Sequence, residues 1–205
     1  MKLHRYLLAG SVGFVVALGM AAGPRLENAP ASPAIVAAEG EYQLDAVHSA
    51  IVFKITHDSV GTFLGRFNDL SGKFTLDAEK PDSGSLEFTI KTDSVDTNNA
   101  DRDKHLRTAD FFNTKQFPDS TFKSKSIKKT ADGFEVAGDL TLCGETKPVT
   151  VKLTSFKTGT SARSKKAIAG FEANFTINRN DFGITKYPGG LGDNVAITVG
   201  IEGAR

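Results

Sequence analysis

The side chains best suited to chemistry in this chain are its histidines, a single cysteine and many carboxylates. His48, His57 and His105 lie too far apart in the sequence to form a recognisable metal-ligand motif, although folding could gather them. Asp101 and His105 stand four residues apart and could supply half of a metal site, but a surface pair on a helix is the simpler interpretation. No Gly-x-Ser-x-Gly or His-Glu-x-x-His motif occurs. The sequence therefore predicts neither a metal site nor a catalytic centre.

Two other features have the residue types of functional sites. Cys143 is the only cysteine, so it forms no intrachain disulfide, and no histidine stands beside it in the sequence. We expect an inert thiol, with redox sensing as the alternative. Gly189, Gly190 and Gly192 have the composition of a phosphate-binding loop, but no Gly-Lys-Ser/Thr follows them. They precede a predicted strand, so a hairpin turn is the expected structure.

The first 38 residues differ in character from the rest of the chain. Lys2 and Arg5 precede an uncharged stretch of 16 residues from Leu7 to Ala22. This stretch is shorter than the about 20 residues that a transmembrane helix needs, and small residues follow it. The layout is that of a secretory signal peptide. Residues 1–38 are predicted to be a signal peptide and low-complexity leader of a periplasmic or secreted protein; a membrane tether formed by an uncleaved segment is the alternative.

The charge balance argues against one large class of partners. Without residues 1–38 the chain keeps 22 basic and 23 acidic side chains, a net charge of −1. A nucleic-acid-binding protein needs a basic surface to neutralise phosphates, so we expect no nucleic-acid partner. Residues 39–205 are enough for one domain that can bury a core without disulfides.

Alternation of apolar and polar residues is the dominant pattern after residue 40. In the most regular segment, Leu86, Phe88 and Ile90 alternate with polar neighbours. Similar alternation marks about nine candidate strands, at 51–55, 63–67, 73–76, 86–91, 121–127, 134–142, 149–154, 171–177 and 195–201. Turn residues separate them at 69–72, 81–84, 131–133, 144–148 and 188–193. Short connections join antiparallel strands, so the pattern predicts an all-β fold with a closed antiparallel sheet.

One polar segment, from Asn98 to Asp110, interrupts the alternation. Asn98 or Asn99 can cap a helix, and Asp103 with Arg107 would form a favourable pair one turn apart. The segment predicts a short helix. Three phenylalanines after it would hold it against the mouth of a barrel: Phe111, Phe112 and Phe117.

The predicted inward face is bulky and poor in polar groups, since the chain has 15 Phe, no Trp and 3 Tyr. A barrel of about eight strands either fills with its own side chains or holds one small ligand, and the residues alone leave both open. Gly65 and Gly138 lie on inward faces between large residues. They favour retained space, although a close backbone crossing would explain them equally well.

Several runs of residues resemble the YceI-like family, also called the polyisoprenoid-binding family. The longest run is 93–112, and others are 117–124, 138–149 and 177–183, while 42–49 resembles the start of the family. The resemblance covers about residues 41–202 and implies a lipocalin-like antiparallel β-barrel of about eight strands, with one short helix near the mouth. Two positions depart from the family: Cys143 replaces a basic residue or histidine, and Glu145 replaces what is often an apolar residue.

The resemblance also implies a function, since members look like carriers of long isoprenoid chains held in an apolar lumen. We therefore expect a non-enzymatic carrier of an isoprenoid lipid or isoprenoid quinone, with no other cofactor and with transient membrane or partner-protein contacts. A broad scavenger of amphiphiles in envelope stress is the alternative, and a small hydrolase or metal enzyme is a remote one. The expected lining consists of Phe53, Ile55, Phe63, Phe67, Phe74, Phe88, Ile90, Phe122, Phe134, Leu140, Leu142, Phe175 and Phe182. The residues expected to meet a polar head group are Arg102, His105, Arg107 and Arg179.

Export can be tested directly on the N-terminus of the protein in its own host. Because the apolar stretch is short and small residues follow it, the exported form should begin between Ala22 and Gly40. N-terminal sequencing of the secreted or periplasmic fraction measures this. A protein that still begins at Met1 and sediments with membranes would support the tether instead.

Overall fold

The computed structural model describes residues 40–205, and the predicted leader lies outside this range. The described residues form eleven strands, one α-helix and three 3-10 helices. The strands are β1 (Tyr42–Leu44), β2 (Ala50–His57), β3 (Gly61–Phe67), β4 (Leu70–Thr75), β5 (Ser85–Lys91), β6 (Val95–Asp96), β7 (Asp119–Thr130), β8 (Gly133–Leu142), β9 (Glu145–Thr160), β10 (Ala167–Asn178) and β11 (Leu191–Ala204). The helices are α1 (Ala100–Leu106), η1 (Pro81–Ser83), η2 (Thr92–Ser94) and η3 (Arg179–Phe182). Within residues 40–205 no helix has the length and apolar character needed to cross a membrane.

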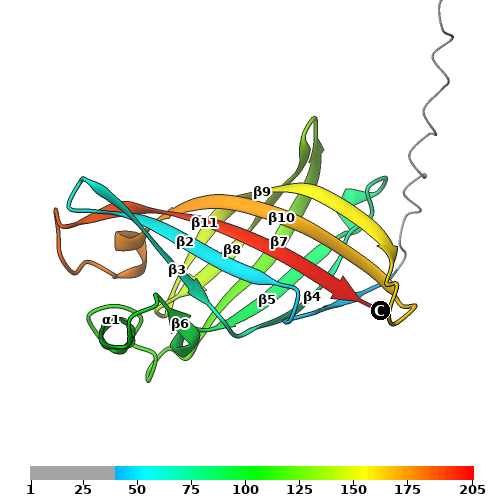
Figure 1. Cartoon of the computed structure of the whole chain (residues 1–205). Helices are drawn as coiled ribbons and strands as arrows, with labels where there is room; N and C mark the ends of the chain where they lie inside the picture. Colours follow the sequence, from blue (N-terminus) through cyan, green and yellow to red (C-terminus); the bar gives the residue numbers. More distant parts are fainter. Residues whose placement is uncertain (1–39) are drawn as a thin grey trace, which may run out of the picture. The chain divides into compact units, whose positions relative to one another are not determined.

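Eight of the strands close into a barrel (Figure 1). The ring runs β1-β4-β5-β7-β8-β9-β10-β11, and β1 pairs with β11 to complete it. All of these pairings are antiparallel. The predicted all-β, lipocalin-like barrel of about eight strands with one short helix is therefore confirmed.

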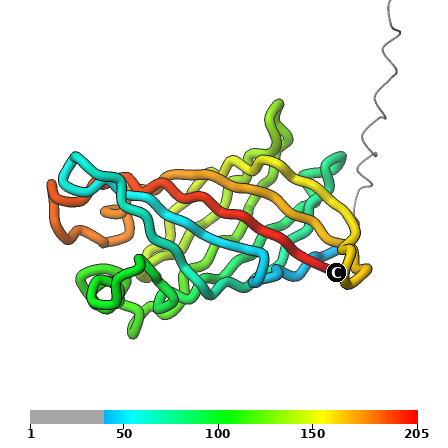
Figure 2. The backbone as a smooth tube through the Cα atoms, in the orientation of Figure 1, coloured from blue at the N-terminus to red at the C-terminus, as the bar shows by residue number. Residues whose placement is uncertain are grey.

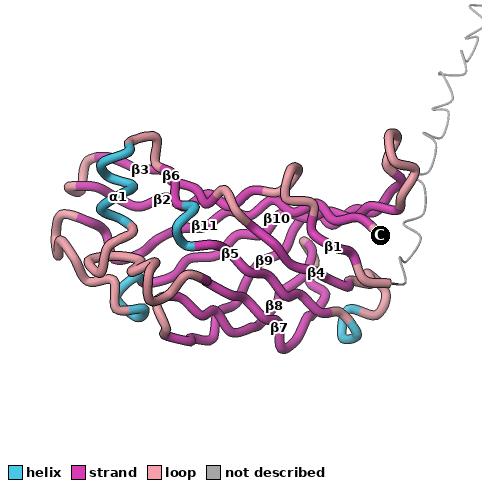
Figure 3. Tube along the Cα trace, turned by 90° about the horizontal axis from the view of Figure 1, so that it is seen from below, coloured by secondary structure: helices cyan, strands magenta, loops and turns pink. Residues whose placement is uncertain are grey.

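The remaining strands, β2, β3 and β6, extend β1, β4 and β5 beyond the ring. β1 pairs with the last residues of β11, and β2 pairs with its earlier part, so β1 and β2 are two halves of one interrupted strand. The same holds for β3 with β4 and for β5 with β6, since each half pairs with the matching half of its neighbour. The continuous tube in Figure 2 shows these breaks as bends. They carry one wall of the barrel on toward α1, which lies beside β3 and β6 at that end (Figure 3).

The sequence pattern missed β1 and β6 and misplaced several turns. β1 and β6 have three and two residues, too few for alternation to be visible. The predicted turns at 69–72, 144–148 and 188–193 extend too far, because β4, β9 and β11 begin at Leu70, Glu145 and Leu191. The turn residues Gly72 and Pro148 therefore lie within strands, where their composition suggested a loop.

The predicted helix is present, but its polar contacts differ from those expected. Asn99 caps α1, since its side-chain oxygen accepts a hydrogen bond from the backbone N–H of Arg102 at 2.9 Å. Asp103 is buried and accepts hydrogen bonds from the backbone N–H and the hydroxyl of Thr97. The predicted pair of Asp103 with Arg107 does not form, because Asp103 faces inward to the preceding loop. α1 is therefore anchored by a buried carboxylate.

Two inward-facing glycines lie beneath phenylalanine rings of a neighbouring strand. Gly65 of β3 is directly opposite Phe53 of β2, and a methyl group added to Gly65 would overlap the Phe53 ring. A methyl group at Gly138 of β8 would lie 2.7 Å from the Phe122 ring. Each glycine makes room for a neighbouring phenylalanine ring. The close backbone crossing that the sequence left open is found at Gly138, where the carbonyl oxygen of Lys123 would lie 2.6 Å from the added methyl group, whereas at Gly65 the nearest atoms all belong to the Phe53 ring.

The end of the barrel away from α1 is filled by packed side chains. Phe74 stacks on Tyr42 with ring centroids 5.2 Å apart and meets Phe171 edge-on at 5.2 Å. Phe134 and Leu153 belong to the same buried cluster. This cluster closes one end of the barrel, so any interior space must lie toward α1.

The packing of rings over glycines predicts the effect of adding one methyl group. Gly65→Ala is expected to lower the free energy of unfolding by about 1–3 kcal/mol, because the Phe53 ring must leave its position. Gly200→Ala in β11 is the matched control, since nothing lies within 4 Å of a methyl group there. Urea unfolding of both variants measures the difference, and Phe53→Leu should restore part of the loss in Gly65→Ala. Equal midpoints for the two glycine variants would contradict this account.

Candidate ligand-binding cavity

The barrel encloses a cavity of about 510 Å³, which is within the range of small-molecule binding pockets. It extends from Phe171 and Ile201, next to the packed end, to Leu106, Phe111 and Tyr187 near α1. Most of the lining side chains are apolar. Ten of the thirteen residues predicted to line a lumen do so: Phe53, Ile55, Phe63, Phe67, Phe88, Ile90, Phe122, Leu140, Leu142 and Phe175.

The other three, Phe74, Phe134 and Phe182, lie in the packed core instead of on the cavity wall. Their side chains are 1%, 6% and 2% exposed, and other core residues surround them. Alternation indicates which residues of a strand face inward, but it does not indicate their height along the barrel. Phe74 and Phe134 are at the filled end, and Phe182 belongs to η3 rather than to a strand. Their prediction as lining residues is corrected on this ground.

Sequence reasoning also omitted part of the lining. Strand residues on the same inward faces could have been found by the same alternation: Ile51, Leu86, Val151, Phe171, Ala173, Ile177, Val195, Ile197, Val199 and Ile201. Other lining residues come from the segment after α1 and from the loop before β11, where no periodic pattern exists: Leu106, Phe111, Phe112, Ile184 and Tyr187. The two segments bring apolar groups over the cavity only because the fold juxtaposes them.

Arg102 is the predicted head-group residue with donors to spare. Its Nε donates to the Thr97 hydroxyl at 2.9 Å, and its Nη2 donates to the Thr97 carbonyl at 2.6 Å. The guanidinium also lies 4.4 Å above the ring centre of Phe63, another lining residue. Nη1 donates no hydrogen bond to any residue in 40–205. Arg102 is therefore held in place and can still donate to a bound oxygen.

Arg179 also borders the cavity, but its hydrogen bonds are all used within the protein. It is only 3% exposed, and its Nε, Nη1 and Nη2 donate to the backbone carbonyls of Gly192, Ile184, Lys186 and Leu191. Nη2 also approaches the Asp193 carboxylate at 3.5 Å. Because a guanidinium has five N–H groups, these five contacts leave none for a ligand. Arg179 fastens the loop between η3 and β11, contrary to its predicted role.

Arg107 does not line the cavity. Its Nε and Nη2 donate to the carbonyl oxygens of Asp93 at 2.7 Å and Val95 at 2.8 Å. These bonds tie the end of α1 to η2 and β6. The predicted head-group role therefore also fails for Arg107, because its side chain is directed to the backbone of its neighbours.

His105 lies at the mouth, in a contact that joins two segments. Its Nε2 is 2.9 Å from Oδ2 of Asp110, and Nζ of Lys186 is 3.2 Å from the same oxygen. The hydrogen bonds from His105 and then Lys186 hold the pKa of Asp110 below its usual value. The His105 ring also meets Phe111 and Tyr187 edge-on. The segment after α1 is thus linked across the mouth to the loop before β11.

Cys143 lies beside this region but not on the cavity wall. It is half-buried, and its Sγ donates to the carbonyl oxygens of Phe111 at 3.5 Å and Phe112 at 3.6 Å. Burial raises the pKa of the thiol to about 11. At neutral pH the sulfur is protonated, and so a weak nucleophile.

Comparison with known proteins places the chain in a family. Residues 42–203 match the model of the YceI-like domain. The chain belongs to the YceI-like family. Protein YceI of Salmonella newport is 41% identical to it over 170 residues, which cover 83% of this chain and 88% of that protein.

Solved structures share the YceI-like fold. BcnA of Burkholderia cenocepacia superposes with a TM-score of 0.68 at 24% identity, over 78% of this chain and 98% of that one. A polyisoprenoid-binding domain from Saccharophagus degradans gives a TM-score of 0.60 at 16% identity, over 80% and 97% of the two chains. At these identities the likeness establishes the fold.

The environment of Cys143 in this YceI-like chain predicts slow thiol chemistry. Labelling of the folded protein by an aromatic disulfide should be slow at pH 7 and accelerate as the pH rises toward 11, whereas the urea-unfolded chain should label rapidly. Cys143→Ser should change the free energy of unfolding by no more than about 1–2 kcal/mol. Fast labelling of the folded protein at pH 7, or a disulfide-linked dimer, would contradict an inert thiol.

Proposed function

We propose that this chain binds an isoprenoid lipid or isoprenoid quinone without catalysing a reaction. The tail occupies the apolar cavity, and the head group lies at the mouth. The observation that carries the proposal is a cavity of about 510 Å³ whose apolar interior is blocked at one end and bordered by Arg102 and His105 at the other. Membership of the YceI-like family and the fold shared with a polyisoprenoid-binding domain support it.

Burial of the tail supplies the binding energy in this proposal. Each five-carbon isoprene unit transferred from water contributes roughly 3–4 kcal/mol, at about 0.8 kcal/mol per carbon, before the costs of ordering the chain. Affinity should therefore rise with chain length until the cavity is full. A packed end then sets an upper limit, because further units would remain in water.

The polar groups at the mouth indicate what kind of head group would be recognised. Arg102 offers the free Nη1 donors, and His105 stands on the same side of the opening. Nη1 of Arg102 can donate to oxygen, so a phosphate or a quinone carbonyl would satisfy it, whereas Nε2 of His105 already pairs with Asp110. An ammonium head group would meet no complementary charge from these two residues.

The absence of catalysis is part of the proposal and rests on the polar lining. Ser120 is the only serine on the cavity wall among the described residues, and its hydroxyl donates to the carbonyl of Thr141 at 2.8 Å. No histidine activates it there. His57 and His105 pair with Asp58 and Asp110, away from any nucleophile. Acyl transfer requires a nucleophile with an adjacent base, and the cavity wall formed by the described part of the chain does not bring such a pair together.

Export to the periplasm or beyond completes the proposal and is supported by the character of residues 1–38. In that compartment an apolar chain has to be shielded from water between membranes. A barrel that covers the tail would serve this purpose, with transient membrane or protein contacts for loading and release.

The proposed function is tested by blocking the cavity while leaving its outer wall unchanged. Ile90→Trp should expel or shorten the ligand that co-purifies from the native host, because Ile90 lines the cavity. Thr89→Trp, on the same strand but not on the cavity wall, is the matched control and should retain the ligand. Phe88→Ala should alter ligand binding at a stability cost below the about 3–5 kcal/mol expected for a filled core. Native mass spectrometry and melting of delipidated protein measure both effects.

Three results would count against a dedicated carrier. Wild-type protein without any co-purified ligand, together with severe destabilisation by both cavity changes, would indicate a filled barrel. Equal affinity for isoprenoids of every length and for unrelated amphiphiles would favour the scavenger. Turnover of a bound substrate would favour the alternative that the protein is a hydrolase.

A further inference from the structure

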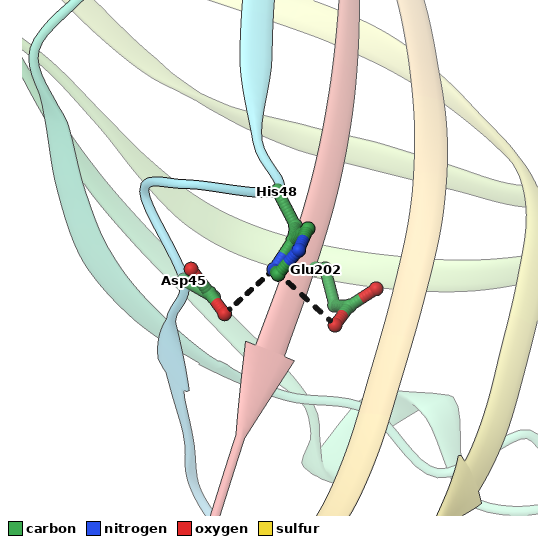
Figure 4. A group of neighbouring side chains, drawn as sticks. All are labelled: Asp45, His48 and Glu202. Carbon is green, nitrogen blue, oxygen red and sulfur yellow. Dashed lines mark hydrogen bonds and ion pairs between the residues drawn. The ribbon is translucent and has the colours of Figure 1, made fainter. Parts of the chain in front are cut away.

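Asp45, His48 and Glu202 converge on the outside of the barrel, next to the seam where its first and last strands meet (Figure 4). Nδ1 of His48 lies 2.9 Å from Oδ2 of Asp45 and 3.9 Å from Oε1 of Glu202. The three atoms all lie within 4.8 Å of one another. None of the three residues borders the cavity, so this cluster is separate from the proposed lipid site.

The backbone holds the three side chains in position. The N–H of Asp45 donates to the carbonyl of Glu202 at 2.8 Å. The hydroxyl of Ser49 donates to that carbonyl at 3.2 Å and accepts from the N–H of Glu202 at 3.1 Å. The N–H of His48 donates to the carbonyl of Asp45 at 3.2 Å. These bonds fix the corner between β1 and β2 against β11, so the cluster does not depend on flexible loops.

The two carboxylates of the cluster make no ion pair with a Lys or Arg of residues 40–205, although Arg163 is near enough to lower the pKa of His48 in part. A single Nδ1–H can donate to one carboxylate, and Asp45 is the one within hydrogen-bonding distance. The Glu202 carboxylate accepts no hydrogen bond from residues 40–205, and no Lys or Arg among them lies within 4.0 Å of it or of the Asp45 carboxylate. The two negative charges of Asp45 and Glu202 are therefore offset in direct contact by at most the single positive charge of the His48 imidazole.

The other histidine–aspartate pairs of the domain lack this excess of negative charge. At His105 the third group is the ammonium of Lys186, which balances Asp110. At His57, Asp58 is the only acidic partner from residues 40–205 within 4.0 Å. Among the described residues, His48 is the only histidine that has two carboxylates beside it. A divalent cation between the three atoms would satisfy both carboxylates and the lone pair of the imidazole.

We propose that Asp45, His48 and Glu202 bind a divalent transition-metal ion of the zinc class, which links the corner between β1 and β2 to β11. The imidazole nitrogen favours such an ion over Ca²⁺ or Mg²⁺, which prefer oxygen ligands alone. Partial exposure of the three side chains leaves the remaining coordination positions to water. The ion would reinforce the seam, because β1 and β11 pair there at only two positions, Gln43 with Ala204 and Leu44 with Gly203.

The test uses tag-free mature protein stripped of metal with a chelator and titrated with ZnCl₂. Calorimetry should show one Zn²⁺ per chain, and the melting temperature should rise with Zn²⁺ because the ion binds only the folded state. His48→Ala and Glu202→Gln should each weaken Zn²⁺ binding by about tenfold or more and abolish the rise in melting temperature. His57→Ala removes an exposed histidine of a pair that lacks the second carboxylate, and it should leave both measurements unchanged.

A second readout guards against a folding defect. Glu202→Gln keeps the size of the side chain, and its metal-free melting temperature and circular dichroism show whether the barrel is intact. Co²⁺ bound to wild-type protein should give visible absorption bands that His48→Ala removes. Wild-type protein that binds no Zn²⁺, or Zn²⁺ affinity that is equal in wild type and His48→Ala, would overturn the proposal and leave the lipid proposal untouched.

Discussion

The antiparallel pairing of β1 with β11 is the contact on which the rest of the structure depends. It joins the first strand of the domain to the last, and it turns an open sheet with two free edges into a closed one. Only a closed sheet has an interior that water cannot enter from the side. Because the contact involves the two ends of the domain, it also has the largest separation in sequence of any pairing in the ring, and it comes with the largest loss of chain entropy.

Closure fixes the size of the interior, and the aromatic side chains then decide how much of it remains free. The rings of Phe53 and Phe122 lie against Gly65 and Gly138 on the barrel wall. A ring that folds onto the wall occupies less of the lumen than one that points to the axis. The packed cluster around Phe74 fills one end, so the free volume lies between this cluster and the end near α1.

How far the sequence predicts the molecule depends on whether a feature is periodic. Alternation found the long strands and ten residues of the cavity wall, since inward-facing residues such as Phe88 and Ile90 recur every second position. It could not find β1 or β6, which are too short, nor the contribution of Tyr187, which reaches the mouth from a loop. Residue type misled for two arginines. Arg107 and Arg179 have the charge to bind a head group, but their donors are taken by backbone carbonyls, and for Arg179 also by Asp193, of segments that come together only on folding. The cluster of Asp45, His48 and Glu202 was invisible for the same reason, because Glu202 joins the other two only when the barrel closes.

Buried hydrogen bonds stabilise one side of the cavity mouth, and exposed ion pairs connect it to the other side. On one side, the loop before β11 is fastened from within by the buried Arg179, whose bonds are shielded from solvent. Across the opening, that loop meets the segment after α1 through the exposed His105, Asp110 and Lys186, and exposed ion pairs contribute little and are screened by salt. These polar contacts therefore hold the rim together less strongly than the buried bonds of Arg179 hold the loop. For any guest in the channel, the rate of escape would then follow the apolar surface it must expose to water, and the residence time would lengthen with each added carbon.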